Sequence, residues 1–140
     1  MALVTRETIF KYIPQRDPIL LVHNIYECSY EASKTGFLVE AHHIFVWDNK
    51  LTETGIVENL AQSVAAQAGY LSAQENIAPK LGFIANIKDL KILSFPEVGS
   101  EVITRIDVKT QVLNFTLIEA ASFVNEKPVA TCEMKIFLQQ

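Results

Sequence analysis

The sequence is poor in cysteine and has no excess of positive charge. Its 140 residues include only two cysteines, Cys28 and Cys132, too few for a disulfide framework or a zinc-binding pattern. Lysine and arginine number 12 against 16 aspartates and glutamates, a net charge of −4, so the basic surface typical of nucleic-acid-binding proteins is absent. We therefore expect a reduced, cytoplasmic protein that does not bind nucleic acid.

Long apolar runs are also missing. The longest, residues 55–73, is interrupted by Glu58, Asn59, Gln62 and Gln67, which argues against a membrane span. The N-terminal residues contain no basic stretch followed by an apolar one, so they do not predict a signal peptide. The sequence predicts neither membrane insertion nor secretion.

Glycine and proline number five each and do not cluster, so no linker divides the chain. We expect a single domain over residues 1–140, a length that buries a core without metal or disulfide support. Hydrophobic residues make up 49% of the chain and charged residues only 20%. An apolar surplus on a small domain usually lies in a subunit interface or a ligand cavity. This composition favours an oligomer.

Residues 54–74 form the predicted central helix. They are rich in alanine and contain no proline, and aliphatic side chains recur at helical spacing. Thr52 or Thr54 can cap the start of this helix. Because the helix is apolar on nearly every side, we expect it to be buried.

Elsewhere the pattern predicts strands, apart from a short helix over residues 7–13. Strand-like runs occur early in the chain, and residues 44–47 form an extended segment that leads into a turn. Four further runs with a period of two indicate an antiparallel meander. The whole predicts an α+β fold in which a curved antiparallel sheet wraps around one long helix. The predicted strands are residues 19–26, 35–41, 80–92, 101–112, 115–124 and 128–138.

Glu58 is the only ionisable residue between Thr54 and Gln74. A carboxylate on a buried helix is costly unless it is paired or neutralised, and Gln62 lies one turn later on the same face. Burial raises the pKa of a carboxyl group, which suits a general acid that works near neutral pH. The alternative is a structural carboxylate favoured by the helix dipole.

The other chemistry-bearing residues give weaker signals. His42 and His43 lie about fifteen residues before Glu58, without further ligands at metal-binding spacing, so no metal site or cofactor is predicted. His23 lies within an apolar run and fits a structural role. The two cysteines have no basic neighbour in sequence that would activate a thiol.

Several segments together resemble the bacterial 3-hydroxyacyl-ACP dehydratases. Residues 13–23 (Ile-Pro-Gln-Arg-Asp-Pro-Ile-Leu-Leu-Val-His) resemble the opening Leu-Pro-His-Arg-aromatic-Pro-apolar-Leu-Leu-Val-Asp of that family. Residues 58–62 (Glu-Asn-Leu-Ala-Gln) resemble its Glu-Ala-Met-Ala-Gln. Residues 84–87 and 98–100 match its Phe-Ala-Gly-Ile and Pro-Gly-Asp at the same separation. The resemblance runs in register from about residue 11 to residue 138.

This resemblance implies the hotdog fold and a dimer with active sites at the subunit interface. In such dehydratases a histidine of one subunit removes the α-proton of an acyl thioester. A glutamate on the partner's helix, here Glu58, protonates the departing 3-hydroxyl group. Backbone amides at the helix start polarise the thioester carbonyl. By this resemblance Gly55, Gln62 and His42 are candidate substrate-binding residues.

The family's His-Phe-Pro-Gly motif is missing, and this absence leaves three interpretations open. Counting back from Glu58 puts the catalytic histidine at Ile44, one residue after His43. In an atypical dehydratase of fatty-acid or polyene-type synthesis, His43 or less favourably His42 takes the base role. In a thioesterase, Glu58 activates water or attacks the thioester without a histidine. In a non-catalytic member, the chain binds acyl groups or pairs with an active hotdog subunit.

The partners follow from these interpretations. We expect an acyl thioester on acyl carrier protein or coenzyme A as the ligand. The chain itself is expected to form a homodimer or higher even oligomer, or a heterodimer with another hotdog protein. The atypical dehydratase, with Glu58 as acid and His43 as base, is the favoured prediction.

Overall fold

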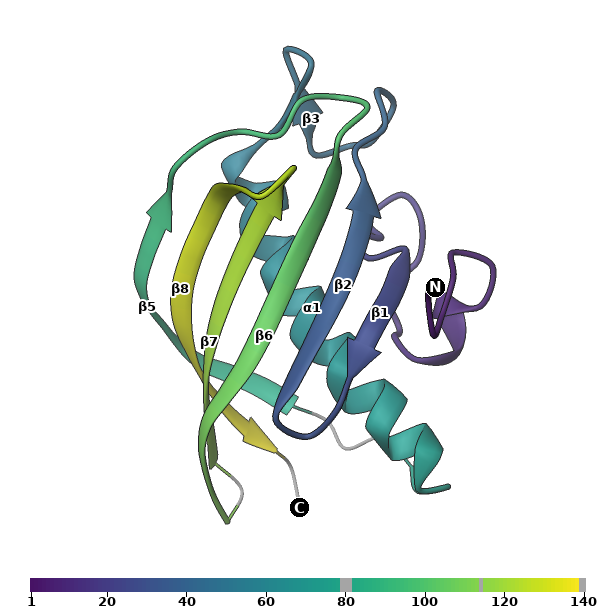
Figure 1. Ribbon diagram of the computed structural model, residues 1–140, viewed down its shortest axis with the longest axis vertical. Helices are drawn as coiled ribbons and strands as arrows, with labels where there is room; N and C mark the ends of the chain where they lie inside the picture. The colour runs from purple at the N-terminus through teal and green to yellow at the C-terminus, as the bar shows by residue number, and fades with distance from the viewer. Residues whose placement is uncertain (79–81, 114, 139–140) are drawn as a thin grey trace.

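Helix α1, Glu53–Gln74, is the longest element, and its bounds confirm the predicted helix. The computed structural model describes residues 1–78, 82–113 and 115–138 (Figure 1). Thr52 is the N-cap, with its side-chain oxygen accepting a hydrogen bond from the Gly55 N–H, as the sequence predicted. Within the described ranges, no helix is long and apolar enough to cross a membrane.

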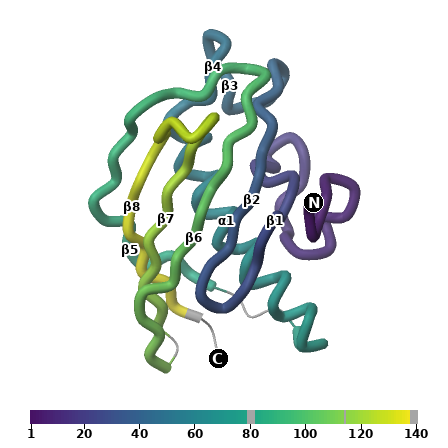
Figure 2. The backbone as a smooth tube through the Cα atoms, viewed as in Figure 1, coloured from purple at the N-terminus to yellow at the C-terminus, as the bar shows by residue number. Residues whose placement is uncertain are grey.

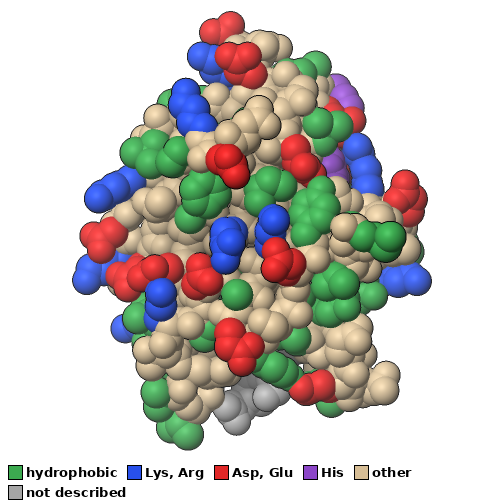
Figure 3. Space-filling view, in the orientation of Figure 1, with side chains coloured by type: hydrophobic (Ala, Val, Ile, Leu, Met, Phe, Trp, Pro, Cys, Tyr) green, Lys and Arg blue, Asp and Glu red, His purple; other side chains and the backbone are tan. Residues whose placement is uncertain are grey.

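A six-stranded antiparallel sheet curves around α1, so the predicted hotdog fold is confirmed (Figure 1). Apolar residues of the helix and the inner sheet face, including Phe37, Leu60 and Met134, form the main core. The outer face carries charged side chains of both signs among hydrophobic ones (Figure 3). The strands in spatial order are β1 (Asn24–Cys28), β2 (Ala32–Leu38), β6 (Glu101–Val112), β7 (Phe115–Val124), β8 (Lys127–Leu138) and β5 (Gly82–Ile92).

The predicted four-strand meander is correct only for β6, β7 and β8. Strand β5 pairs with β8 and not with β6, its successor in sequence. The segment after β5 passes over the end of the sheet to reach β6 (Figure 2). Alternating apolar residues specify strands but do not specify which strands are neighbours. The predicted start of this strand, at residues 80–81, lies outside the described residues.

Strand β5 forms one edge of the sheet and is exposed along almost its whole length. Its exposed apolar side chains include Phe83 at 53%, Ile84 at 40% and Ile87 at 37% relative exposure. No other strand in the described part of the chain pairs with its outer edge. An unpaired apolar edge strand of this length is a typical protein-binding surface.

Three local predictions require correction. The helix expected over residues 7–13 is a single 3-10 turn, η1 (Ile9–Lys11). The predicted strand over residues 19–26 starts only at Asn24, because side chains of α1 bind the backbone of residues 19–21 instead. Strand β2 begins and ends three residues earlier than the predicted run over 35–41.

The predicted extended segment and turn near residue 46 form a short hairpin. Strand β3 (Val46–Trp47) pairs with β4 (Lys50–Leu51), and Asp48 and Asn49 have φ angles of 51° and 64°. Positive φ at both central residues is typical of a tight hairpin turn, and both residue types tolerate it. This hairpin lies directly before the start of α1.

The buried face of α1 is less apolar than predicted. Thr35 Oγ1 on β2 and Ser63 Oγ share a hydrogen bond of 2.8 Å, and Thr104 Oγ1 on β6 donates to Asn59 Oδ1 at 2.6 Å. All four residues are fully or almost fully buried. Helix and sheet are therefore joined by paired polar groups as well as by apolar packing.

Candidate functional site

Glu58 and Gln62 lie one turn apart on α1 and are in contact, as predicted. Gln62 Nε2 donates to Glu58 Oε1 at 3.3 Å. Glu58 is half-buried, whereas Gln62 is almost completely buried. The carboxyl group is thus held at the helix surface, more accessible than the fully buried carboxylate predicted from the apolar helix.

Gln62 also binds the backbone of the segment before β1. Its Oε1 accepts the Leu21 N–H at 2.7 Å, and its Nε2 donates to the Ile19 carbonyl at 2.9 Å. Asn59 Nδ2 donates to the Leu21 carbonyl at 2.7 Å. These bonds satisfy backbone groups that have no strand partner. Gln62 is therefore a structural tether of residues 19–21 and at the same time the neighbour of Glu58.

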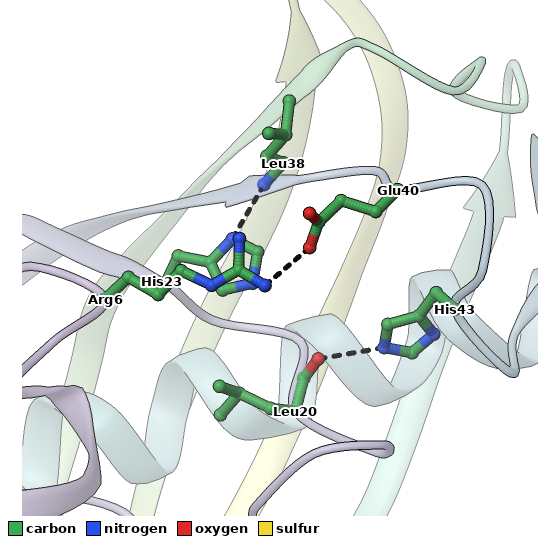
Figure 4. A network of polar contacts seen from close by, with 6 residues as sticks. All are labelled: Arg6, Leu20, His23, Leu38, Glu40 and His43. Atoms are coloured by element: carbon green, nitrogen blue, oxygen red, sulfur yellow. Dashed lines mark hydrogen bonds and ion pairs between the residues drawn. The ribbon is translucent and has the colours of Figure 1, made fainter.

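His43 is buried, with a backbone partner at each ring nitrogen. Nε2 is 2.9 Å from the Leu20 carbonyl oxygen, and Nδ1 accepts the Phe45 N–H at 3.1 Å (Figure 4 shows the first contact). The carbonyl requires a hydrogen on Nε2 and the amide requires a lone pair on Nδ1. The structure thus leaves His43 no free lone pair with which to accept a substrate proton.

Gly55 and His42, the other two predicted substrate-binding residues, lie in the first turn of α1 and in the segment before β3. The Gly55 N–H is directed at the Thr52 side chain, and a Cβ at Gly55 would lie 2.6 Å from Leu51 Cδ1 and 2.9 Å from Phe45 Cβ. Gly55 is therefore packed beneath the β3–β4 hairpin. His42 is exposed and makes no side-chain hydrogen bond within the described ranges. No hydrogen bond or ion pair in that part of the chain joins either histidine to Glu58.

His23 is a buried histidine with a structural role, as predicted. Its Nδ1 accepts the Leu38 N–H at 3.2 Å, and the Arg6 guanidinium is hydrogen-bonded to Glu40 at 2.6 Å (Figure 4). Burial, with a smaller contribution from Arg6, lowers the pKa of His23 to about 4. His23 is thus neutral in the folded protein at neutral pH.

This lowered pKa predicts a stability loss in mild acid. Between pH 6.5 and pH 4 the unfolded chain binds a proton at His23 that the folded chain does not, so the free energy of unfolding falls as the pH falls through this window. His23→Asn keeps an acceptor for the Leu38 N–H but cannot titrate. We expect its melting temperature to fall less steeply than that of the wild type from pH 7 to pH 4. Equal slopes in thermal melts would contradict this assignment.

A cavity of about 500 Å³ lies between α1, residues 11–15 and the start of β5. The helix contributes Ala61, Ala65 and Ala68, which share a face with Glu58 because they follow it at helical spacing. A second cavity of about 250 Å³ shares Val64, Ala68 and Ile136 with the first and continues toward Ser72. The small size of these helix residues is the sequence signal for this space, which was not predicted.

The two cysteines and the acidic and histidine side chains form no further reactive or metal-binding group in the described part of the chain. Burial raises the pKa of Cys28 and of Cys132 to about 11, so neither thiol is activated. Among the residues that the structure describes, no group of three His, Cys, Asp or Glu side chains could hold a metal ion. Glu58 with its Gln62 partner, on the helix face whose alanines line the larger cavity, is the best-supported candidate site.

Comparison with known proteins agrees with this fold. The sequence model of the ApeP-like family, described as ApeP dehydratase, matches residues 7–140. A chain of the dehydratase heterocomplex ApeI:P from Xenorhabdus doucetiae aligns with a TM-score of 0.84 and 15% identity, over 94% of this chain and 91% of that one. A search of curated proteins finds no match.

More distant structures share the fold. Cj0977, a sigma28-regulated virulence protein from Campylobacter jejuni, aligns with a TM-score of 0.70 and 11% identity, over 93% of this chain and 84% of that one. A hypothetical thioesterase from Streptococcus pneumoniae, solved with coenzyme A, aligns with a TM-score of 0.68 and 8% identity, over 82% of this chain and 84% of that one. At such identities the likeness establishes the hotdog fold alone.

Proposed function

Because the chain belongs to the ApeP-like dehydratase family, we propose that it is the acid-bearing subunit of a dehydratase acting on 3-hydroxyacyl thioesters. In this reaction a base removes the α-proton and an acid protonates the 3-hydroxyl group, which leaves as water. The products are a 2-enoyl thioester and one water molecule. The observation that carries the proposal is the half-buried Glu58 carboxyl, held by Gln62 on the helix face whose alanines line an apolar cavity.

Glu58 suits the acid role because only one of its oxygens is engaged. Gln62 Nε2 contacts Oε1, whereas Oε2 has no hydrogen-bond partner within the described ranges. Oε2 is therefore free to carry the transferred proton. The acyl chain would lie along the alanine-rich face of α1, in the cavity that extends away from Glu58. Apolar lining with few polar groups suits a hydrocarbon chain.

We propose that the base comes from a second hotdog chain. His43 Nε2 must carry a hydrogen to meet the Leu20 carbonyl, and Nδ1 already accepts the Phe45 N–H. To accept a proton, the ring would have to break one of these buried contacts. This argues against His43 as the base and favours a partner that retains the His-Phe-Pro-Gly motif missing here.

The exposed edge of β5 is the proposed interface with that partner. It bears unpaired backbone groups and apolar side chains, and its first residues line the cavity beside α1. Pairing with an edge strand of another hotdog chain would bury both the strand and the open side of the cavity. A chain of a complex described as a dehydratase heterocomplex is among the similar folds, which supports the heterodimer among the assemblies expected from the sequence.

A reconstitution assay tests this proposal. The chain is purified alone and together with a hotdog dehydratase of the same organism that retains the motif. Hydration of a trans-2-enoyl thioester, on coenzyme A and on carrier protein, is followed in both. We expect the chain alone to be at least about 100-fold slower than the complex, since it lacks a positioned base. His43→Gln, which keeps a donor for the Leu20 carbonyl, should leave the rate of the complex within about threefold, a change smaller than the loss of a base.

Other outcomes identify the competing functions. Full activity of the chain alone, lost in His43→Gln, would establish a homodimeric dehydratase in which His43 is the base. Thiol release that depends on Glu58 would establish a thioesterase. A complex whose activity is unaffected by Glu58→Gln would make this chain a non-catalytic subunit.

A further inference from the structure

Two buried threonines lie side by side on neighbouring strands and make separate contacts with α1. Thr35 on β2 and Thr104 on β6 are paired in register, and both are completely buried. Thr35 is hydrogen-bonded to Ser63, and Thr104 donates to Asn59. The two contacts look equivalent, but only the Thr104 contact belongs to a chain of hydrogen bonds that leads to Glu58.

The Leu21 carbonyl and the Thr104 hydroxyl together satisfy the Asn59 amide. The carbonyl can only accept, so it faces the amide nitrogen, which donates to it at 2.7 Å, and Thr104 Oγ1 then donates to Asn59 Oδ1 at 2.6 Å. A flipped amide would place its oxygen against that carbonyl oxygen. An unmade or repulsive contact between buried polar groups is destabilising, so one orientation is strongly favoured.

The Leu21 peptide links Asn59 to Gln62. Its carbonyl is held by Asn59 and its N–H donates to Gln62 Oε1 at 2.7 Å. Gln62 Nε2 is thereby directed at the Ile19 carbonyl and at Glu58 Oε1. A flipped Gln62 would oppose the Leu21 N–H with its own donors and would turn its oxygen toward the Glu58 carboxyl group.

We propose that Asn59 and Thr104 are positioning residues for Glu58, acting through the Leu21 peptide and the Gln62 amide. This inference rests on the proposed function of Glu58 as the acid. The relay keeps an N–H donor on Glu58 Oε1 and leaves Oε2 for the substrate. As Glu58 gives up its proton, the same donor stabilises the carboxylate that forms. Asn59 and Thr104 are 1% and 0% exposed, so neither touches substrate.

This relay is a feature of this chain's own residues. The dehydratase motif that residues 58–62 resemble has alanine at the position of Asn59, and alanine cannot bind the Leu21 carbonyl. A buried amide joined to a buried hydroxyl is costly unless both are satisfied, and here both are. Asn59 and Thr104 thus add hydrogen bonds that hold the backbone segment to which Gln62 is bound.

Three variants test the relay in the reconstituted complex. Thr104→Val removes the hydroxyl with little change of shape, Thr104→Ser keeps it, and Thr35→Val is the matched control on the neighbouring strand. We expect Thr104→Val to lower kcat by about threefold to tenfold, the worth of one ordinary buried hydrogen bond, with KM unchanged. Thr104→Ser should restore kcat. Thr35→Val should lower the melting temperature to a similar extent without lowering kcat.

A second readout is independent of catalysis. In NMR spectra, the Gln62 side-chain NH₂ signals, assigned by their loss in Gln62→Glu, should shift and exchange faster in Thr104→Val but not in Thr104→Ser or Thr35→Val. Unchanged signals in Thr104→Val would overturn the relay whatever the activity. An equal loss of kcat in Thr35→Val would also overturn it. Altered signals in a complex without dehydratase activity would support the relay while the proposed function fails.

Discussion

Glu58→Gln is expected to lower dehydratase turnover of the complex by about 10²–10⁴-fold, the usual contribution of a positioned acid. Glutamine has the same shape and retains an oxygen that can accept from Gln62 Nε2, as Glu58 Oε1 does at 3.3 Å. It cannot deliver a proton to a leaving hydroxyl group. The measurement is steady-state hydration of an enoyl thioester, with a thermal melt of the same preparation.

Glu53→Gln is the matched control for this substitution. Glu53 is an exposed carboxylate in the first turn of the same helix, so its replacement changes the charge of α1 equally without touching the site. We expect its turnover to equal that of the wild type, and the melting temperatures of both variants to stay within a few degrees. A Glu58→Gln complex that retained a tenth or more of the activity would eliminate Glu58 as the acid.

Gly69→Ala is expected to have the largest effect on stability. A Cβ at Gly69 would overlap the carbonyl oxygen of Tyr12 and lie 2.9 Å from its carbonyl carbon. Alanine gains about 0.5–1 kcal/mol over glycine within a helix. Overpacking against fixed backbone costs about 1–3 kcal/mol or more and outweighs that gain. We expect a net loss of about 2 kcal/mol, which lowers the melting temperature by roughly 5–10 °C.

Gly55→Ala provides the comparison for Gly69→Ala within the same helix. Its new methyl group would meet mainly the Leu51 side chain, whose end can move, although Phe45 Cβ lies 2.9 Å away. We expect a smaller loss than for Gly69→Ala, measured by urea unfolding of both variants. The opposite order would show that the Tyr12 segment moves away from α1 without cost.

The helix and most strands could be predicted because their patterns are local. Alanine-rich, proline-free sequence defines α1 to within one residue, and alternating apolar residues define β6 and β7. The position of β5 in the sheet could not be predicted, because its alternating pattern fits a strand paired with β6 as well as one paired with β8. Residues 19–21 look like the start of a strand, but the amides of Asn59 and Gln62 take the backbone hydrogen bonds that a neighbouring strand would have made.

The site was predictable only where it depends on helix geometry. Glu58 and Gln62 are four residues apart, so their contact follows from the helical repeat alone. The contacts of His43 with Leu20 and Phe45 depend on how the segment before the β3–β4 hairpin folds back, which no local pattern encodes. For the same reason, Thr104 gave no signal in the sequence, since its partner Asn59 lies 45 residues away.

The exposed β5 edge also bears on how the chain behaves while no other chain covers it. An 11-residue strand with a free edge and apolar side chains can pair with another copy or with an unrelated strand. Chains whose β5 edge stays uncovered would therefore be prone to aggregation. Co-expression with the proposed partner is expected to raise the soluble yield of this protein.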